Sequence, residues 1–133
     1  EGFALRPFDE ELFGLARAEA WSRDLVALFP DYAAFAETGI GMGVVHQGAL
    51  VSGASSYCVY DDGIEIEIDT KTAFRGRGLA TACGAGLILA CRERGLYPGW
   101  DAYDLRSVTL AEKLGYHMDA PYTVYEFLRA ETL

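Results

Sequence analysis

Hydrophobic residues follow helical spacing in the first third of this chain. A short apolar run at residues 3–8 is interrupted by Pro7, which suits an edge strand because proline lacks the amide donor of a central strand. Asp9 is then well placed to cap the first of several helices. Apolar residues at helical spacing predict a helix at 12–20. Two further short helical stretches are predicted at 22–28 and 31–36, separated by Pro30 and ending before Gly39.

From Gly41 onwards the pattern changes to that of β-strands. Three strand-like runs separated by short turns predict an antiparallel meander, at residues 44–46, 49–60 and 64–70. The third run begins with Ile64 and alternates isoleucine with Glu65, Glu67 and Asp69. Successive strand residues point to opposite faces, so this strand carries three isoleucines on one face and three carboxylates on the other.

The C-terminal half is predicted to return to the sheet. A helix at 79–94, stopped by Gly95, is followed by a strand at 97–103. A strand, a helix and a strand in this order predict that the strands 64–70 and 97–103 are parallel. The remaining predicted elements are a helix at 107–114 and a closing hairpin of 116–118 with 122–127.

Composition narrows the class of protein. The 133 residues are 51% apolar and 13% aromatic, enough for one continuous core, so residues 1–133 are expected to form a single domain. A net charge of −9 argues against binding nucleic acid. The apolar stretch 79–91 is too short to span a membrane, and the first residues lack the pattern of a secretory signal. With three cysteines, an odd number, these features predict a cytoplasmic protein with reduced thiols.

A glycine-rich segment carries the main candidate chemistry. It reads Arg75-Gly76-Arg77-Gly78-Leu79-Ala80 and lies between a predicted strand and the start of a helix, where free amides favour phosphate oxygens. Arg75 and Arg77 add positive charge that can meet a pyrophosphate or a ribose phosphate. On its own the segment also fits an ordinary strand-to-helix turn. It lacks the lysine of a Walker A loop, and Thr81 stands where a dinucleotide fingerprint needs its third glycine.

Two landmarks together resemble the GNAT superfamily of N-acyltransferases. Arg75-x-x-Gly78-x-Ala80 resembles its R/Q-x-x-G-x-G/A signature, and residues 110–116, ending in Lys113-Leu114-Gly115-Tyr116, resemble its second landmark. The span 64–116 is similar to the subgroup that includes antibiotic self-resistance acetyltransferases. The resemblance implies an α/β (α+β) fold with a mixed, mostly antiparallel sheet of about six or seven strands. It also implies acetyl-CoA as co-substrate, with the two parallel strands splayed to admit its pantetheine arm.

The resemblance also implies where the cofactor binds. Backbone groups of Ile68 and Thr70, on either side of Asp69, would pair with the pantetheine amides, and amides of Gly76 to Ala80 would hold the pyrophosphate. Asp104 and Ser107 stand where relatives carry Asn and Ser or Ala near the cofactor arm. Asp104 fits the N-cap of the following helix equally well.

The catalytic groups are predicted from the acidic strand face. Glu67 is the candidate base, directly or through water, and Glu65 a candidate contact for the substrate amine. These carboxylates can also be read as solvated or paired with arginines, and a β-bulge would change which of them faces the substrate. Ala111 stands where many relatives carry a tyrosine acid, which leaves Tyr103 and Tyr116 as substitutes or as core residues. His46 and His117 are isolated, so no metal is expected.

The predicted function is therefore acetyl transfer from acetyl-CoA to a primary amine of a small molecule or peptide. A sensor that binds acetyl-CoA without turnover is the main alternative, because of Ala111 and Asp104. A nucleotide-binding protein is a third. The sequence does not name the amine, and a homodimer is compatible with the resemblance.

Overall fold

The computed structural model describes residues 2–60, 63–101, 114, 116–119 and 124–127. Its helices and strands follow the chain in the order β1 (Phe3–Pro7), α1 (Glu10–Ala18), the 3-10 helix η1 (Arg23–Val26), α2 (Tyr32–Thr38), β2 (Gly41–His46), β3 (Ala49–Tyr60), β4 (Gly63–Thr70), the 3-10 helix η2 (Thr72–Phe74), α3 (Leu79–Arg94), β5 (Tyr97–Asp101), β6 (Tyr116–Asp119) and β7 (Val124–Phe127).

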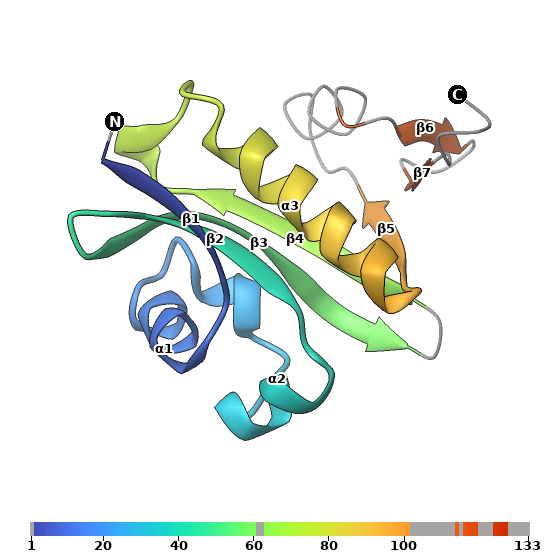
Figure 1. Ribbon diagram of the computed structural model, residues 1–133, viewed down its shortest axis with the longest axis horizontal. Coiled ribbons are helices and arrows are strands. Elements are labelled where there is room, and N and C mark those ends of the chain that lie inside the picture. Colours follow the sequence, from blue (N-terminus) through green and yellow to red (C-terminus); the bar gives the residue numbers. More distant parts are fainter. Residues whose placement is uncertain (1, 61–62, 102–113, 115, 120–123, 128–133) are drawn as a thin grey trace.

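Within these residues, seven strands form one mixed sheet in the order β1-β2-β3-β4-β5-β7-β6. The first four strands are an antiparallel meander, β4 and β5 are parallel, and β7 pairs antiparallel with both β5 and β6. Figure 1 shows α3 on one face of the sheet and α1 and α2 on the other. The predicted fold class, the meander and the parallel crossover are thereby confirmed.

The sheet separates two hydrophobic cores. On the α3 side, Ile64 and Ile66 pack with helix residues that include Cys83, Leu87 and Cys91. The core on the other side is formed by α1, η1 and α2 with part of β3, through the buried side chains of Phe8, Leu12, Phe13, Ala16, Leu25, Val26, Phe35 and Leu50. Successive residues of a strand feed opposite faces, so the alternation in the sequence is the cause of this division.

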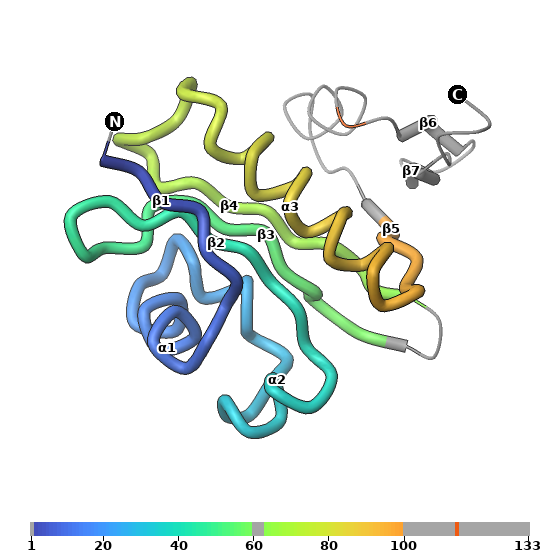
Figure 2. The backbone as a smooth tube through the Cα atoms, viewed as in Figure 1, coloured from blue at the N-terminus to red at the C-terminus, as the bar shows by residue number. Residues whose placement is uncertain are grey.

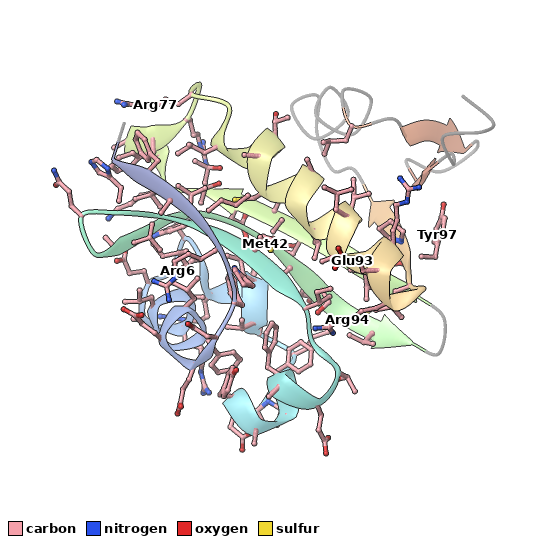
Figure 3. All side chains as sticks on the ribbon, viewed as in Figure 1. Arg6, Met42, Arg77, Glu93, Arg94 and Tyr97 are labelled. Carbon is pink, nitrogen blue, oxygen red and sulfur yellow. The ribbon has the colours of Figure 1, made fainter. Side chains whose placement is uncertain are left out.

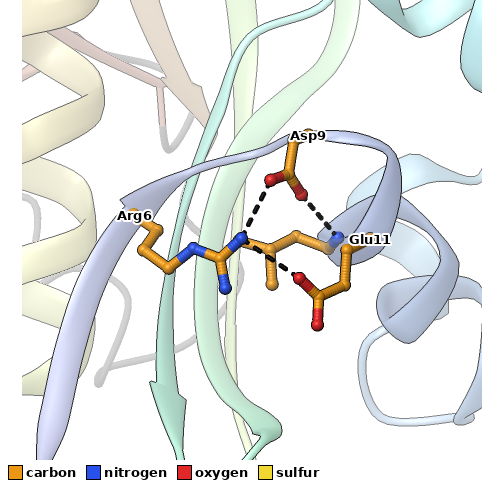
Figure 4. A network of polar contacts seen from close by, with 4 residues as sticks. Arg6, Asp9 and Glu11 are labelled. Carbon is orange, nitrogen blue, oxygen red and sulfur yellow. Dashed lines mark hydrogen bonds and ion pairs between the residues drawn. The ribbon is translucent and has the colours of Figure 1, made fainter.

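The first helix begins where the sequence places its cap. Asp9 Oδ1 accepts a hydrogen bond from the amide of Leu12 at 2.9 Å, which satisfies one of the free donors of the first turn. Arg6 on β1 donates to Asp9 at 2.8 Å and to Glu11 at 3.2 Å, so the cap is held by the preceding strand (Figure 4).

Residues with positive φ stand at two places where the chain changes direction. Gln47 (φ 54°) and Gly48 (φ 80°) form the tight β2–β3 turn, and Gly95 (φ 72°) ends α3 in the left-handed conformation. Figure 2 shows that β1 and the connection leading into α3 lie at the same end of the molecule. A ring contact between Phe3 and Phe74, with centroids 6.1 Å apart, joins them.

Some predicted elements differ from the structure or lie outside it. Residues 22–28 are predicted to be helical, yet only the four residues of η1 form a 3-10 helix. The backbone there makes i to i+3 hydrogen bonds, from the Leu25 amide to the Ser22 carbonyl at 3.0 Å and from the Ala27 amide to the Asp24 carbonyl at 3.5 Å. The predicted helix at 107–114 falls outside the described residues except for Leu114. No helix in the described part of the chain has both the length and the apolar character needed to cross a membrane.

Candidate functional site

The described pairing of the parallel strands β4 and β5 covers only the first half of β4. It runs from Gly63 opposite Tyr97 to Ile66 opposite Trp100, and the structure describes β5 as far as Asp101. Trp100 also pairs with Tyr125 of β7 on the other side of β5, and Asp101 pairs with Val124 there. In the described part of the chain, residues 67–70 of β4 therefore have a strand partner on the β3 side only, and we call their other side the open edge.

Hydrogen bonding shows which residues present their backbone to the open edge. The amide of Lys71 donates to the Val51 carbonyl of β3 at 2.9 Å. Backbone groups alternate in direction along a strand, so odd-numbered residues at this end of β4 face β3. Ile68 and Thr70 consequently direct their N–H and C=O groups to the open edge, as the pairing of a strand-like ligand would require.

The glycine-rich loop leads from this edge into the longest helix. Gly76 (φ 79°) and Gly78 (φ 78°) both adopt the left-handed conformation, and a Cβ atom at either position would meet nothing within 4 Å. The first hydrogen bond of α3 runs from the Ala82 amide to the Gly78 carbonyl at 3.1 Å, and no side chain caps the helix. The amides of Leu79 and Ala80 thus precede the first helical hydrogen bond, at the positive end of the helix dipole.

The two arginines of this loop make different contacts. Arg75 Nε donates to the Thr70 carbonyl at 3.3 Å, so its guanidinium lies at the open edge of β4. The Arg77 guanidinium carbon lies 5.6 Å from the centroid of the Phe74 ring. Both side chains are exposed, and Figure 3 shows Arg77 projecting away from the loop. Cationic groups therefore stand beside the free amides of the helix, in a chain of net charge −9.

The carboxylates of β4 face the opposite side of the sheet from α3. Ile64 and Ile66 are buried against α3, so the alternating Glu65, Glu67 and Asp69 point towards α1 and η1. The two register shifts beside β3 add their extra residues to β3, so the alternation within β4 is unbroken.

The 3-10 helix η1 lies directly over these acids. Ser55 is the cross-strand partner of Glu67, and its hydroxyl donates to the Leu25 carbonyl of η1. Gly53 is the partner of Asp69, and a Cβ atom there would lie only 2.8 Å from Leu25 Cδ1. The absence of a side chain at position 53 is what allows η1 to approach the acidic face.

Glu67 and Asp69 form a coupled pair of carboxyl groups. Burial raises the pKa of Glu67 to about 8, helped by a hydrogen bond with Asp69 and by the negative charges of Asp69 and Asp24. Burial also raises the pKa of Asp69, whereas the hydrogen bond from Glu67 and the charge of Arg75 lower it. Glu67 is thus the proton donor and Asp69 the acceptor. Asp69 Oδ2 is buried without a hydrogen-bond partner among the described residues.

Several predicted site residues cannot be placed. Tyr103, Asp104, Ser107 and Ala111 lie outside the described residues. Tyr116 begins β6, but only its backbone pairing with Phe127 is described. Conversely, Asp24 was not predicted from the sequence. A lone acid in a short helical stretch gives no local signal that it will face a strand more than forty residues later. In the described part of the chain no three His, Cys, Asp or Glu side chains gather as a metal site would need.

A mixed sheet with two parallel strands, β4 and β5, next to a glycine loop at a helix N-terminus, is the architecture expected of GNAT N-acyltransferases. The sequence pattern that defines GNAT acetyltransferases matches residues 1–125. The chain belongs to this family. The narrower likeness to antibiotic self-resistance enzymes remains a prediction.

Individual relatives agree with this assignment. YdfB of Bacillus subtilis (strain 168), an uncharacterized N-acetyltransferase, is 30% identical over 131 residues, covering 94% of this chain and 48% of YdfB. The crystal structure of a GCN5-related N-acetyltransferase-like protein from Streptococcus suis 89/1591 is 52% identical with a TM-score of 0.89, over 96% of this chain and 51% of that one. The chain thus spans about half the length of these two relatives.

A more distant structure shares the fold. The protein yncA of Salmonella typhimurium, solved with its cofactor acetyl-CoA, is 16% identical with a TM-score of 0.65, over 95% of this chain and 91% of that chain. At this identity the likeness concerns the architecture alone.

Proposed function

We propose that this chain transfers an acetyl group from acetyl-CoA to a primary amine of a small molecule or peptide, by direct attack in a ternary complex. One observation carries the proposal: the open edge of β4 continues into the glycine loop at the N-terminus of α3. An acyl-CoA is an extended amide chain with a diphosphate at one end. Strand edge and helix terminus are arranged in that same sequence.

In this proposal the pantetheine amides pair with Ile68 and Thr70, on either side of Asp69, and the diphosphate lies on the amides between Gly76 and Ala80. The open edge supports the first contact, because its backbone groups have no strand partner there among the described residues. The two left-handed glycines support the second, because nothing lies within 4 Å of where their side chains would be. Asp104 and Ser107 stay predicted contacts of the cofactor arm.

Glu67 is proposed as the base. It is the first residue of β4 beyond the last described pair with β5, so it lies at the start of the open edge. A carboxyl group with a pKa of about 8 is a closer match to an alkyl ammonium than an ordinary glutamate is. Proton transfer from the ammonium to the ionised form of Glu67 would leave a neutral amine able to attack the thioester carbonyl.

The covalent step then balances with one more proton. A bond forms between the amine nitrogen and the acetyl carbon, the carbon–sulfur bond breaks, and the thiolate takes up the second proton of the amine. Tyr103 remains the predicted acid: its hydroxyl would protonate the thiolate and would regain a proton from the amine. Glu65, two residues before Glu67 on the same face of β4, is proposed to contact the amine. The Oδ2 atom of Asp69, which has no hydrogen-bond partner among the described residues, supports a positively charged amine as the substrate that receives the acetyl group.

The buried thiols and the net charge bear on the compartment and the partners of the chain. Cys83 and Cys91 are buried free thiols, which supports a reducing compartment such as the cytoplasm. The acidic charge supports an amine partner and not a nucleic acid.

A sensor that binds acetyl-CoA without turnover is the second candidate. The observation that favours it is Ala111, which occupies the position of the tyrosine acid in the resembling family. Turnover with an amine would separate the two functions.

The direct test is release of free thiol from acetyl-CoA in the presence of polyamines, aminoglycosides and peptide N-termini. We expect amine-dependent release with at least one class, and a loss of about 10²-fold at pH 7 in Glu67→Gln, in line with the usual contribution of a general base. Glu93→Gln is the matched control, because Glu93 is exposed on α3 (Figure 3). Full activity of Glu67→Gln across the pH range would contradict the role of Glu67.

A further inference from the structure

The open edge of β4 already has a partner at one of its acceptors. The carbonyl of Thr70 accepts a hydrogen bond from Nε of Arg75 at 3.3 Å. Arg75 follows Thr70 by only five residues, across the short helix η2, and opens the glycine loop. Its side chain therefore reaches back from the loop to the strand.

This contact conflicts with the proposed binding of the acyl donor. The Thr70 carbonyl faces the open edge, where a pantetheine amide would approach to donate its hydrogen bond. A guanidinium on the same oxygen takes one of its two lone pairs and lies on the side of the strand from which the amide would approach. We therefore expect the donor to displace Arg75 from Thr70 as the strand-like pairing is completed.

A diphosphate can provide that displacement. The Thr70 contact joins an exposed guanidinium to one neutral carbonyl, whereas a diphosphate offers charged oxygens that a guanidinium binds in a forked, charge-assisted geometry. The free amides at the start of α3, four and five residues after Arg75, are the place where the diphosphate would be held. Moving from the carbonyl to the phosphate is favourable only when the phosphate is present.

We propose that Arg75 is a specificity-determining residue for the acyl donor: it covers the Thr70 carbonyl until a diphosphate at the start of α3 draws it away. This inference rests on the proposed function and deepens it. A diphosphate-bearing donor frees its own pairing edge, whereas a thioester of pantetheine alone has to compete with Arg75 for Thr70. The chain thereby selects coenzyme A thioesters over shorter ones of the same acyl group.

Arg77 supplies a matched comparison. It is two residues away, is likewise exposed and carries the same charge, yet its guanidinium packs over the Phe74 ring and not against the strand edge. Loss of Arg77 removes one positive charge from the loop without freeing the Thr70 carbonyl.

The test is calorimetric titration of the wild type, Arg75→Ala and Arg77→Ala with acetyl-CoA and with S-acetylpantetheine. Arg75→Ala should bind acetyl-CoA about 3- to 30-fold more weakly, because a charge-assisted contact is lost. The same variant should bind S-acetylpantetheine about 2- to 10-fold more tightly than the wild type, because the competitor for Thr70 is gone. Arg77→Ala should weaken acetyl-CoA binding without tightening the binding of S-acetylpantetheine.

The two proposals fail in different ways. If the wild type binds acetyl-CoA but Arg75→Ala binds S-acetylpantetheine no better than the wild type does, undetectable binding included, the role of Arg75 is overturned and the proposed function stands. Equal tightening in Arg77→Ala would also overturn it, since charge alone would then explain the effect. If the wild type does not bind acetyl-CoA, the proposed function fails and the inference with it.

Discussion

At the scale of single residues, the environment of Glu67 differs most from that of an ordinary surface carboxylate. It shares a hydrogen bond with Asp69, and Asp24 adds a negative charge from η1. Burial raises the pKa of Asp69 as well, and the positive charge of Arg75 opposes that rise. Burial disfavours the charged form of Glu67, and two carboxyl groups this close cannot both ionise easily, so the pair retains a proton at a pH where an isolated glutamate has lost it.

The pH dependence of activity should therefore depend on Asp69. In the wild type, activity limited by ionisation of Glu67 should rise with pH through a pKa near 8. Asp69→Asn removes the negative charge that favours the protonated form of Glu67, so the rise in kcat/KM should move to lower pH by about one unit. The measurement is the pH profile of kcat/KM.

Asp24→Asn is the control for this prediction, because Asp24 makes the smallest contribution to the raised pKa of Glu67. Its profile should move less than that of Asp69→Asn. A carbon-13 titration of the Glu67 carboxyl follows the same shift without relying on turnover. An unchanged profile and an unchanged titration in Asp69→Asn would show that the pair does not set the proton affinity of Glu67.

At the scale of elements, the site depends on how β4 ends and α3 begins. The chain leaves the strand, makes the short turn η2 and enters α3 through Gly76 and Gly78, both left-handed. Any other L-residue is strained at such a φ, whatever the space around it. These glycines thus keep the helix amides uncovered at the end of the open edge.

Gly78→Ala tests this connection. The substitution should lower the free energy of unfolding by about 1 kcal/mol through backbone strain alone, because its Cβ would meet nothing within 4 Å. It should also weaken acetyl-CoA binding by about 10-fold, equivalent to about 1.4 kcal/mol, as the loop moves from the geometry that presents its amides. Chemical denaturation and calorimetric titration measure the two effects.

Gly14→Ala provides the opposite expectation for the same substitution. Gly14 is exposed within α1 and has a negative φ and open space, so alanine should stabilise the fold by about 0.5–1 kcal/mol without changing acetyl-CoA affinity. If Gly78→Ala is as stable as the wild type and binds acetyl-CoA equally well, the loop does not depend on its left-handed glycines.

At the scale of the whole molecule, the sequence predicted the helices and strands better than the contacts between them. The bounds of α3 and the order of the meander follow from local periodicity, and Gly95 marked the end of the helix. Strict alternation along β4 predicted that Glu65, Glu67 and Asp69 share one face of the sheet. The position of η1 over these acids did not, because it depends on long-range contacts of Leu25 with Ser55 and Gly53.

The contact of Arg75 with Thr70 was also beyond sequence reasoning. The signature motif drew attention to Arg75 as a phosphate ligand, whereas the structure places its Nε on a strand carbonyl. Side chains that connect neighbouring elements are chosen by the geometry between those elements, which periodicity does not report.

The central claim is that an acyl-CoA binds along the open edge of β4 and at the start of α3. An amide NMR titration of the isotope-labelled chain with acetyl-CoA tests it most directly. We expect the largest shift changes at Ile68, Thr70 and the amides from Gly76 to Ala80, with small changes on the exposed side of α1. Saturating changes that gather on α1 and leave β4 and the glycine loop unaffected, or no changes at millimolar acetyl-CoA, would contradict the claim.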